Sequence, residues 1–171
     1  MACVYRGAEA TMKFNKTVFG VGGFIILLIA AGYAANSRAD TVNIGVGKSV
    51  INSHLKTGEI GYEHKNWEVQ ASLMESGNTK NGNQKQVVLY SVSYITEPEW
   101  GYKGVQPYLR LGISHNTGSE LVGANNFRLG IGVNFKEVFR LEYVHHSSAG
   151  IYKNNTGIDY VMLNYVMEAP W

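Results

Sequence analysis

Apolar and polar residues alternate along most of the chain after residue 40. Within residues 127–135, every odd-numbered position is apolar and every even-numbered position is polar or glycine. A period of two is typical of β-strands that have one apolar and one polar face. Segments of this kind, separated by turn signals rich in Gly and Asn, predict about eight strands. They lie at about residues 41–48, 57–64, 67–73, 86–96, 106–115, 127–135, 139–143 and 159–165.

One long apolar run precedes these segments. Residues 17–36 carry no charge, Lys13 and Lys16 come before them, and small residues follow. This order is typical of a secretory signal peptide, with cleavage after Ala35 or Ala39. A retained membrane anchor is the alternative, because the run is long enough to span a bilayer.

The chain therefore divides into two regions. Residues 1–39 form an N-terminal extension and signal peptide, starting at Met1 or Met12, and residues 40–171 form one exported domain. The first region holds four of the 15 Lys and Arg residues and one of the 13 Asp and Glu residues, so the exported domain has a net charge of −1. A nucleic-acid partner requires a basic face, so this class of partner is excluded.

Composition narrows the fold class further. Charged residues make up 16% of the chain, against about 25% in an average soluble protein, and 20 residues are glycine. The mean hydropathy of −0.12 and the single long apolar run exclude a bundle of membrane helices. The one cysteine, Cys3, excludes a disulfide scaffold and a Cys-ligated zinc site. We therefore expect an all-β domain.

Alternation alone fits a soluble barrel with an apolar interior or an outer-membrane barrel with an apolar exterior. Three features favour an eight-stranded antiparallel outer-membrane β-barrel. The apolar face holds aromatic residues that a small barrel would hardly enclose, namely Phe127, Phe135, Phe139, Tyr143 and Tyr165. The opposite face carries glycines and charged residues that suit a narrow, ion-paired lumen, namely Arg110, Arg128, Arg140 and Glu142. The chain ends on an aromatic residue, Trp171, in phase with the apolar face of the last strand.

Three residues with catalytic chemistry converge near the end of the chain. His145 and Ser147 are two positions apart on the seventh predicted strand, so both side chains lie on its apolar face. Asp159 begins the eighth strand on the same face, and a hairpin would bring the three together. Unpaired polar side chains are costly beside lipid, and these three types compose a Ser-His-acid triad. The alternative is that they are interfacial residues leading into a loop.

Two further histidines need an interpretation. His146 points to the face opposite His145, so we expect it in the lumen or at its rim. His115 lies where the fifth strand meets its loop, and the sequence offers no partners for a metal site there.

The sequence around the three residues resembles the outer-membrane lipid A 3-O-deacylases, the PagL family. Residues 145–150 read His-His-Ser-Ser-Ala-Gly and residues 155–159 read Asn-Thr-Gly-Ile-Asp. The family carries His-x-Ser-Asn-Ala-Gly and Asn-x-Gly-Ile-Glu at the same spacing. The resemblance implies that Ser147 is the nucleophile, His145 the general base and Asp159 the acid that orients the base.

Two positions depart from the family pattern. Asp159 replaces a Glu, and Ser148 replaces an Asn that is linked to oxyanion stabilisation. Loss of one oxyanion donor reduces turnover by about 100- to 1,000-fold, so another donor is needed. The candidates are the Ser148 hydroxyl and the backbone N–H groups from Ser148 to Gly150. If the strand stays regular, Ser148 points into the lumen and the backbone alone donates.

The resemblance implies a serine esterase that hydrolyses the 3-O-linked acyl chain of lipid A and needs no metal or organic cofactor. The expected substrate is lipid A or lipopolysaccharide in the outer leaflet of a Gram-negative outer membrane, in which the barrel is embedded. A non-enzymatic small barrel for adhesion or envelope integrity is the alternative function. The oligomeric state stays open, with a homodimer as one option.

Overall fold

A computed structural model describes residues 40–119, 121–151 and 156–169. The predicted signal peptide, Cys3 and Trp171 lie outside these described residues. No helix within the described ranges is long and apolar enough to cross a membrane.

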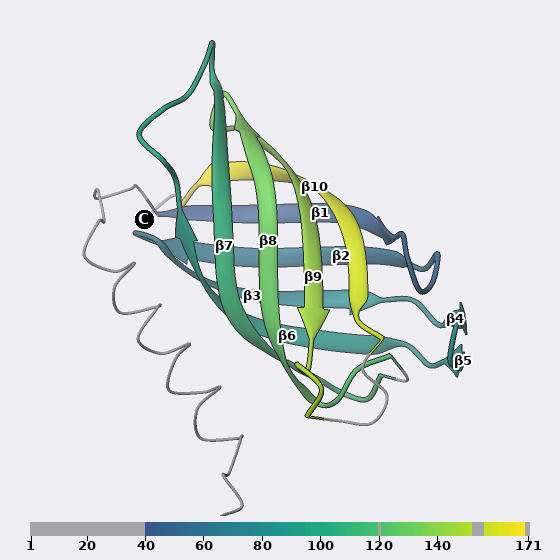
Figure 1. Cartoon of the computed structure of the whole chain (residues 1–171). Coiled ribbons are helices and arrows are strands. Elements are labelled where there is room, and N and C mark those ends of the chain that lie inside the picture. The colour runs from purple at the N-terminus through teal and green to yellow at the C-terminus, as the bar shows by residue number, and fades with distance from the viewer. Residues whose placement is uncertain (1–39, 120, 152–155, 170–171) are drawn as a thin grey trace, which may run out of the picture.

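Eight antiparallel strands close into a barrel in the order β1-β10-β9-β8-β7-β6-β3-β2 (Figure 1). The barrel strands are β1 (Thr41–Ser49), β2 (Lys56–His64), β3 (Trp67–Met74), β6 (Val87–Thr96), β7 (Val105–Asn116), β8 (Asn125–Phe135), β9 (Phe139–Ser147) and β10 (Ile158–Glu168). Pairing of β1 with β10 leaves no free sheet edge in the barrel. The eight predicted strands and the eight-stranded antiparallel barrel are confirmed.

Two short strands, β4 (Gly77–Thr79) and β5 (Gly82–Gln84), form a small hairpin in the connection between β3 and β6. The Gly- and Asn-rich sequence between the predicted strands indicates turns in this connection. In the structure, only the tip of the hairpin is a turn. The hairpin lies at the end of the barrel where β9 ends and β10 begins, which also carries loops 50–55, 117–124 and 148–157. The opposite end carries connections 65–66, 97–104 and 136–138. The two longest connections, 75–86 and 148–157, are therefore at the same end of the barrel.

The outward face of the barrel is apolar, as the alternation predicts. On β10, for example, Val161, Leu163 and Tyr165 are exposed while the residues between them are buried. The same alternation recurs around the barrel, with exposed apolar side chains that include Ile44, Val46, Ile60, Val69, Val92, Ile113, Ile131, Phe139 and Leu141. A continuous apolar exterior is the surface that an outer-membrane barrel presents to lipid. The expected assignment of the faces is confirmed.

The lumen is filled by a network of buried ion pairs. Arg110 donates to Glu142 through Nη1 and to Glu68 through Nη2, the latter at 3.1 Å. Arg140 donates to Glu63 at 2.7 Å. These side chains are at most 1% exposed, so each charge depends on its partner rather than on water. The predicted ion-paired lumen is confirmed.

Two glycines on the inward face of β8 make room for this network. A Cβ atom at Gly130 would lie 1.8 Å from Oε1 of Glu142 and 3.1 Å from the Cβ atom of Arg110. A Cβ atom at Gly132 would lie 2.7 Å from the ring of Tyr108. The high glycine content therefore has a steric cause, because the narrow lumen has no space for two side chains at one level.

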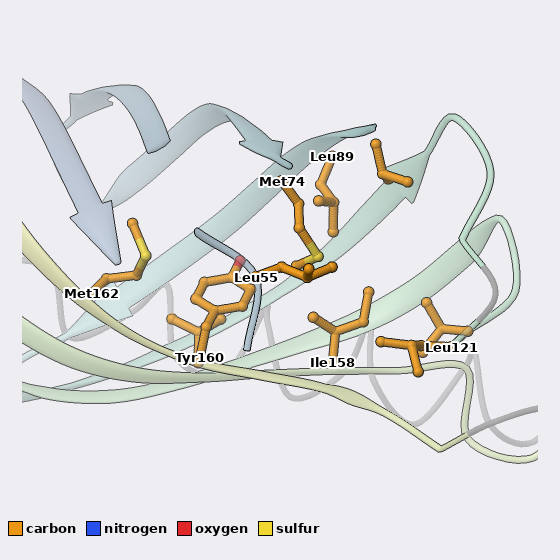
Figure 2. Close-up of a cluster of buried hydrophobic side chains, with 10 residues drawn as sticks. Leu55, Met74, Leu89, Leu121, Ile158, Tyr160 and Met162 are labelled. Atoms are coloured by element: carbon orange, nitrogen blue, oxygen red, sulfur yellow. The ribbon is translucent and has the colours of Figure 1, made fainter. Parts of the chain in front are cut away.

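An apolar cluster closes the lumen at the end that carries the longer loops (Figure 2). Its members come from β3, β6, β9, β10 and two loops: Leu55, Met74, Val87, Leu89, Leu121, Val122, Val144, Ile158, Tyr160 and Met162. Ile158 and Tyr160 flank Asp159 in sequence and point inward. The cluster therefore anchors the first residues of β10 from inside, on the side opposite the predicted triad.

We expect Arg110→Ala to lower the free energy of unfolding by about 3–5 kcal/mol, because it removes the cation paired with the buried Glu142 carboxylate and the nearer of the two cations beside Glu68. Urea unfolding in detergent micelles, followed by heat-modifiable gel mobility, measures the change. Lys85→Ala is the control, since Lys85 is exposed in a loop. Equal stability of the two variants would contradict the interpretation.

Candidate catalytic site on the lipid-facing wall

The β9–β10 pairing brings His145 directly opposite Asp159. Nδ1 of His145 lies 2.7 Å from Oδ1 of Asp159. The Asp159 side chain is 6% exposed although it is on the outward face, and the His145 side chain is 37% exposed. The imidazole thus covers the carboxylate and keeps its own Nε2 edge available to the outside. This contact confirms that the hairpin brings these two predicted residues together.

Ser147 ends β9 on the same outward face, two residues after His145. In the register of β8 and β9 it pairs with Phe127, whereas His145 pairs with Leu129. The backbone N–H of Ala149 donates to Oγ of Ser147 at 3.2 Å. The hydroxyl therefore has a backbone partner at the point where the strand ends, on the face of β9 that also carries His145.

A tight turn follows the serine. Ala149 and Gly150 both have positive φ angles, of 50° and 74°, and the N–H of Ile151 donates to the carbonyl of Ser148 at 3.0 Å. Two consecutive positive φ angles are the pattern of a type I′ turn, which disfavours a residue with a Cβ such as Ala149. Strained backbone of this kind concentrates at functional sites.

Ser148, a predicted oxyanion residue, lies on the inward side of this turn. It is fully buried, and its Oγ accepts a hydrogen bond of 3.5 Å from the N–H of Gly123 in loop 117–124. Gly150, the other predicted oxyanion residue, is exposed at the turn on the outside. The side chain of Ser148 and that of Ser147 therefore point to opposite faces, as strand alternation continued by one residue requires.

Tyr143 belongs to the site, and sequence analysis assigned it only to the lipid-facing aromatic residues. Its Oη donates to Oδ1 of Asp159 at 2.5 Å, the same oxygen that His145 contacts. Tyr143 precedes His145 by two residues on the same face of β9. That spacing was the available signal, because it places the phenol beside whatever His145 contacts on β10.

Gly157 closes the site from the loop side. Its φ angle is +78°, which residues with a Cβ atom rarely adopt. A Cβ atom there would lie 2.8 Å from Cε1 of His145 and 3.4 Å from Oδ2 of Asp159. The glycine of the segment 155–159 therefore lets the loop pass close to the His-Asp pair.

His146 and His115 lie outside the cluster that His145, Ser147 and Asp159 form. His146 is fully buried in the lumen, as predicted, with Nδ1 2.7 Å from Oγ of Ser114 and Nε2 2.7 Å from Oη of Tyr160. His115 is exposed, and its Nδ1 lies 2.8 Å from Oδ1 of Asn125. In the part of the chain that the structure describes, no three His, Cys, Asp or Glu side chains gather as metal ligands.

An apolar groove of about 1020 Å³ runs over the outer wall and reaches Phe127 on β8. Its floor follows one row of paired residues across the strands, from Val42 through Tyr62, Val69, Val92 and Ile113 to Phe127. Phe127 is the residue directly across from Ser147. The groove therefore offers an apolar path that leads to the hydroxyl.

The fold and this cluster define an outer-membrane-type barrel with a candidate serine hydrolase site on its lipid-facing wall. The sequence model of the lipid A 3-O-deacylase (PagL) family matches residues 51–168, and the chain belongs to this family. No curated protein matches the sequence significantly.

Solved structures agree with the fold. The crystal structure of the outer membrane enzyme PagL is similar with a TM-score of 0.51 and 19% identity, covering 75% of this chain and 99% of that chain. The N-terminal β-barrel domain of Pseudomonas aeruginosa OprF gives a TM-score of 0.47 at 15% identity, covering 77% and 98%. Ail of Yersinia pestis gives 0.44 at 15% identity, covering 77% and 100%.

We expect Gly157→Ala to slow labelling of Ser147 by a serine-reactive fluorophosphonate by about tenfold, because the new methyl group displaces His145 and each tenfold change corresponds to about 1.4 kcal/mol. Gly118→Ala is the matched control. Gly118 also has a positive φ, of 129°, but a Cβ atom there has no neighbour within 4 Å. The expectation fails if both variants label at the same rate.

Proposed function

We propose that this protein is a lipid A deacylase, a serine esterase that hydrolyses the 3-O-linked acyl chain of lipid A. The observation that carries the proposal is the His145–Asp159 contact beside Ser147 on an apolar outer wall, in a chain of the lipid A 3-O-deacylase family. An enzyme that acts on a membrane lipid needs its nucleophile on the surface that lipid touches. The three residues occupy that surface.

In the proposed reaction His145 takes the proton of the Ser147 hydroxyl, and Oγ attacks the carbonyl carbon of the 3-O-acyl ester. Asp159 accepts the hydrogen bond from Nδ1 of His145 and stabilises the imidazolium that forms. The protonated His145 then gives its proton to the departing sugar oxygen, which leaves an acyl group on Ser147. Water, deprotonated by His145, attacks this ester, and a free 3-hydroxyacyl fatty acid is released.

The oxyanion of the tetrahedral intermediate is held, in this proposal, by backbone N–H groups between Ser148 and Gly150. The N–H of Ala149 already donates to Oγ of Ser147, next to the position where the oxyanion develops. The hydroxyl of Ser148 faces Gly123 on the inner side, which supports the backbone rather than this side chain as the donor.

The substrate, in this proposal, is reached from the outer leaflet. Outer-membrane barrels have short periplasmic turns and longer extracellular loops, and the site lies at the end with the longest connections. The groove that leads to Phe127 offers an apolar surface against which acyl chains of lipid A can lie. Export by the predicted signal peptide delivers the barrel to the outer membrane.

We expect Ser147→Ala to reduce deacylation by about 1,000-fold or more, because it removes the nucleophile. Mass spectrometry of lipid A from cells that express each variant measures the loss of one acyl chain. Ser148→Ala folds into the same barrel and serves as the matched control for a serine in this segment. Identical lipid A in cells with the wild type and with Ser147→Ala would contradict the proposed function.

We expect Ser148→Ala to keep turnover within about threefold of the wild type, because the backbone donors remain and one lost side-chain donor would cost about 100-fold or more. Ser148→Asn tests the residue that the family carries at this position. Turnover on purified lipid A is measured for both variants, with folding checked by heat-modifiable gel mobility. A 100-fold loss of turnover in Ser148→Ala would contradict this expectation and indicate that the Ser148 hydroxyl donates to the oxyanion.

A further inference from the structure

Two hydrogen-bond donors converge on one oxygen of Asp159. Nδ1 of His145 lies 2.7 Å from Oδ1, and Oη of Tyr143 lies 2.5 Å from the same atom. Tyr143 sits two residues further from the loop end of β9 than His145, so its phenol reaches Asp159 from the membrane side. The carboxylate is thereby enclosed between an imidazole, a phenol and the backbone at Gly157.

The surroundings of Asp159 make such a donor necessary. The side chain is 6% exposed and lies on a wall whose neighbouring outward residues on β10 are Val161 and Leu163. A carboxylate that loses water without gaining donors is strongly disfavoured in an apolar environment. The phenol supplies one donor and Nδ1 of His145 supplies the other, and neither of these protons is transferred in the proposed reaction.

The barrel contains a second cluster of the same composition at its opposite end. Oη of Tyr62 donates to Oδ2 of Asp40 at 2.8 Å, and Nδ1 of His64 lies 2.7 Å from Oδ1. Tyr62 and His64 are spaced on β2 as Tyr143 and His145 are on β9. Tyr62 and His64 hold the pKa of the Asp40 carboxyl below its usual value, with the Tyr62 hydrogen bond as the larger cause of lowering.

The two clusters differ in the carboxylate oxygens that accept the hydrogen bonds and in the residue two positions after the histidine. At Asp40 the two donors use different carboxylate oxygens, and the residue two positions after His64 is Asn66. At Asp159 both donors use Oδ1, and the residue two positions after His145 is Ser147. A Tyr-Asp-His contact is thus a stable arrangement on this wall by itself, and only one of the two stands beside a serine.

We propose that Tyr143 is a positioning residue of the catalytic site, which fixes the carboxylate of Asp159 so that it faces Nδ1 of His145. The proposal rests on the deacylase function proposed above. Asp159 is one methylene shorter than the Glu of the family pattern, so its carboxylate reaches His145 in few orientations. The phenol selects one of them and gives the carboxylate a hydrogen-bond partner beside lipid.

The hydrogen bond from the Tyr143 phenol has two opposite effects on kcat. A hydrogen bond from Tyr143 withdraws charge from Oδ1 and so weakens its stabilisation of the His145 imidazolium. The same hydrogen bond orients the carboxylate, and a misplaced triad group costs turnover. We propose that orientation is the larger effect, so removal of the hydroxyl lowers kcat.

The experiment compares Tyr143→Phe with the wild type in detergent micelles, with kcat and KM measured on purified lipid A. Hydrogen bonds to charged groups contribute about 1.5–3 kcal/mol, so we expect kcat to fall by about 10- to 100-fold. KM stays within about twofold, because the ring and its contact with lipid remain. Tyr165→Phe is the matched control, since it removes a phenol from the exposed face of β10 outside the groove and leaves kcat unchanged.

A double-mutant cycle with Asp159→Asn separates positioning from a general structural role. If Tyr143 acts through Asp159, Tyr143→Phe causes no further loss of kcat in the Asp159→Asn background. An equal loss in both backgrounds, a kcat equal to that of Tyr165→Phe, or a rise in kcat would each overturn the proposal.

Fluorophosphonate labelling of Ser147 distinguishes a failure of this inference from a failure of the proposed function. If the wild type labels at Ser147 but leaves lipid A intact, the lipid A assignment falls, and the labelling rates of the same variants decide the role of Tyr143. If the wild type cleaves lipid A and Tyr143→Phe matches it in both assays, the function stands and the inference falls. If Ser147→Ala equals the wild type in both assays, both proposals fall.

Discussion

Every backbone N–H and C=O group of a membrane-spanning segment must find a partner within the protein, because lipid offers none. In this chain the pairing of β1 with β10 meets that requirement by closing the sheet. Closure fixes the register of β9 against β10, and that register places His145 opposite Asp159. The meeting of His145 with Asp159 is thus a consequence of the same hydrogen bonds that keep the barrel in the membrane.

Closure also makes a lumen too narrow for water to solvate charges, and the chain fills it with paired charges. Arg110 and Arg140 bridge carboxylates from strands far apart in sequence, so the ion pairs join the two halves of the wall. Glycines such as Gly130 are required at the same level, because a second side chain would meet Glu142.

The sequence predicted the eight strands, the face assignment and the meeting of His145 with Asp159, because all three follow from a period of two. Alternation indicates on which face of a strand a side chain lies, but it does not indicate which neighbouring group the end of a long side chain contacts. The contact of Tyr143 with Asp159 was therefore missed. The β4–β5 hairpin was missed for a different reason: its residues are mostly polar or glycine, so the pairing is carried by the backbone without an apolar pattern. The position of the Ser148 hydroxyl depended on whether alternation continues past the last paired residue, which the pattern alone left open.

A polar cluster on a lipid-facing wall has to reconcile two demands. Lipid disfavours every unpaired polar group, yet the nucleophile has to stay open to an ester that arrives within the lipid phase. The structure separates these demands among the members of the cluster. Asp159 is enclosed and receives donors from His145 and Tyr143, whereas His145 keeps more than a third of its side chain exposed. The buried carboxylate thus has its hydrogen-bond partners within the protein, while the imidazole remains partly exposed on the lipid-facing wall. The same apolar surroundings that make the cluster costly to build also strengthen each of its hydrogen bonds, since no water competes for them.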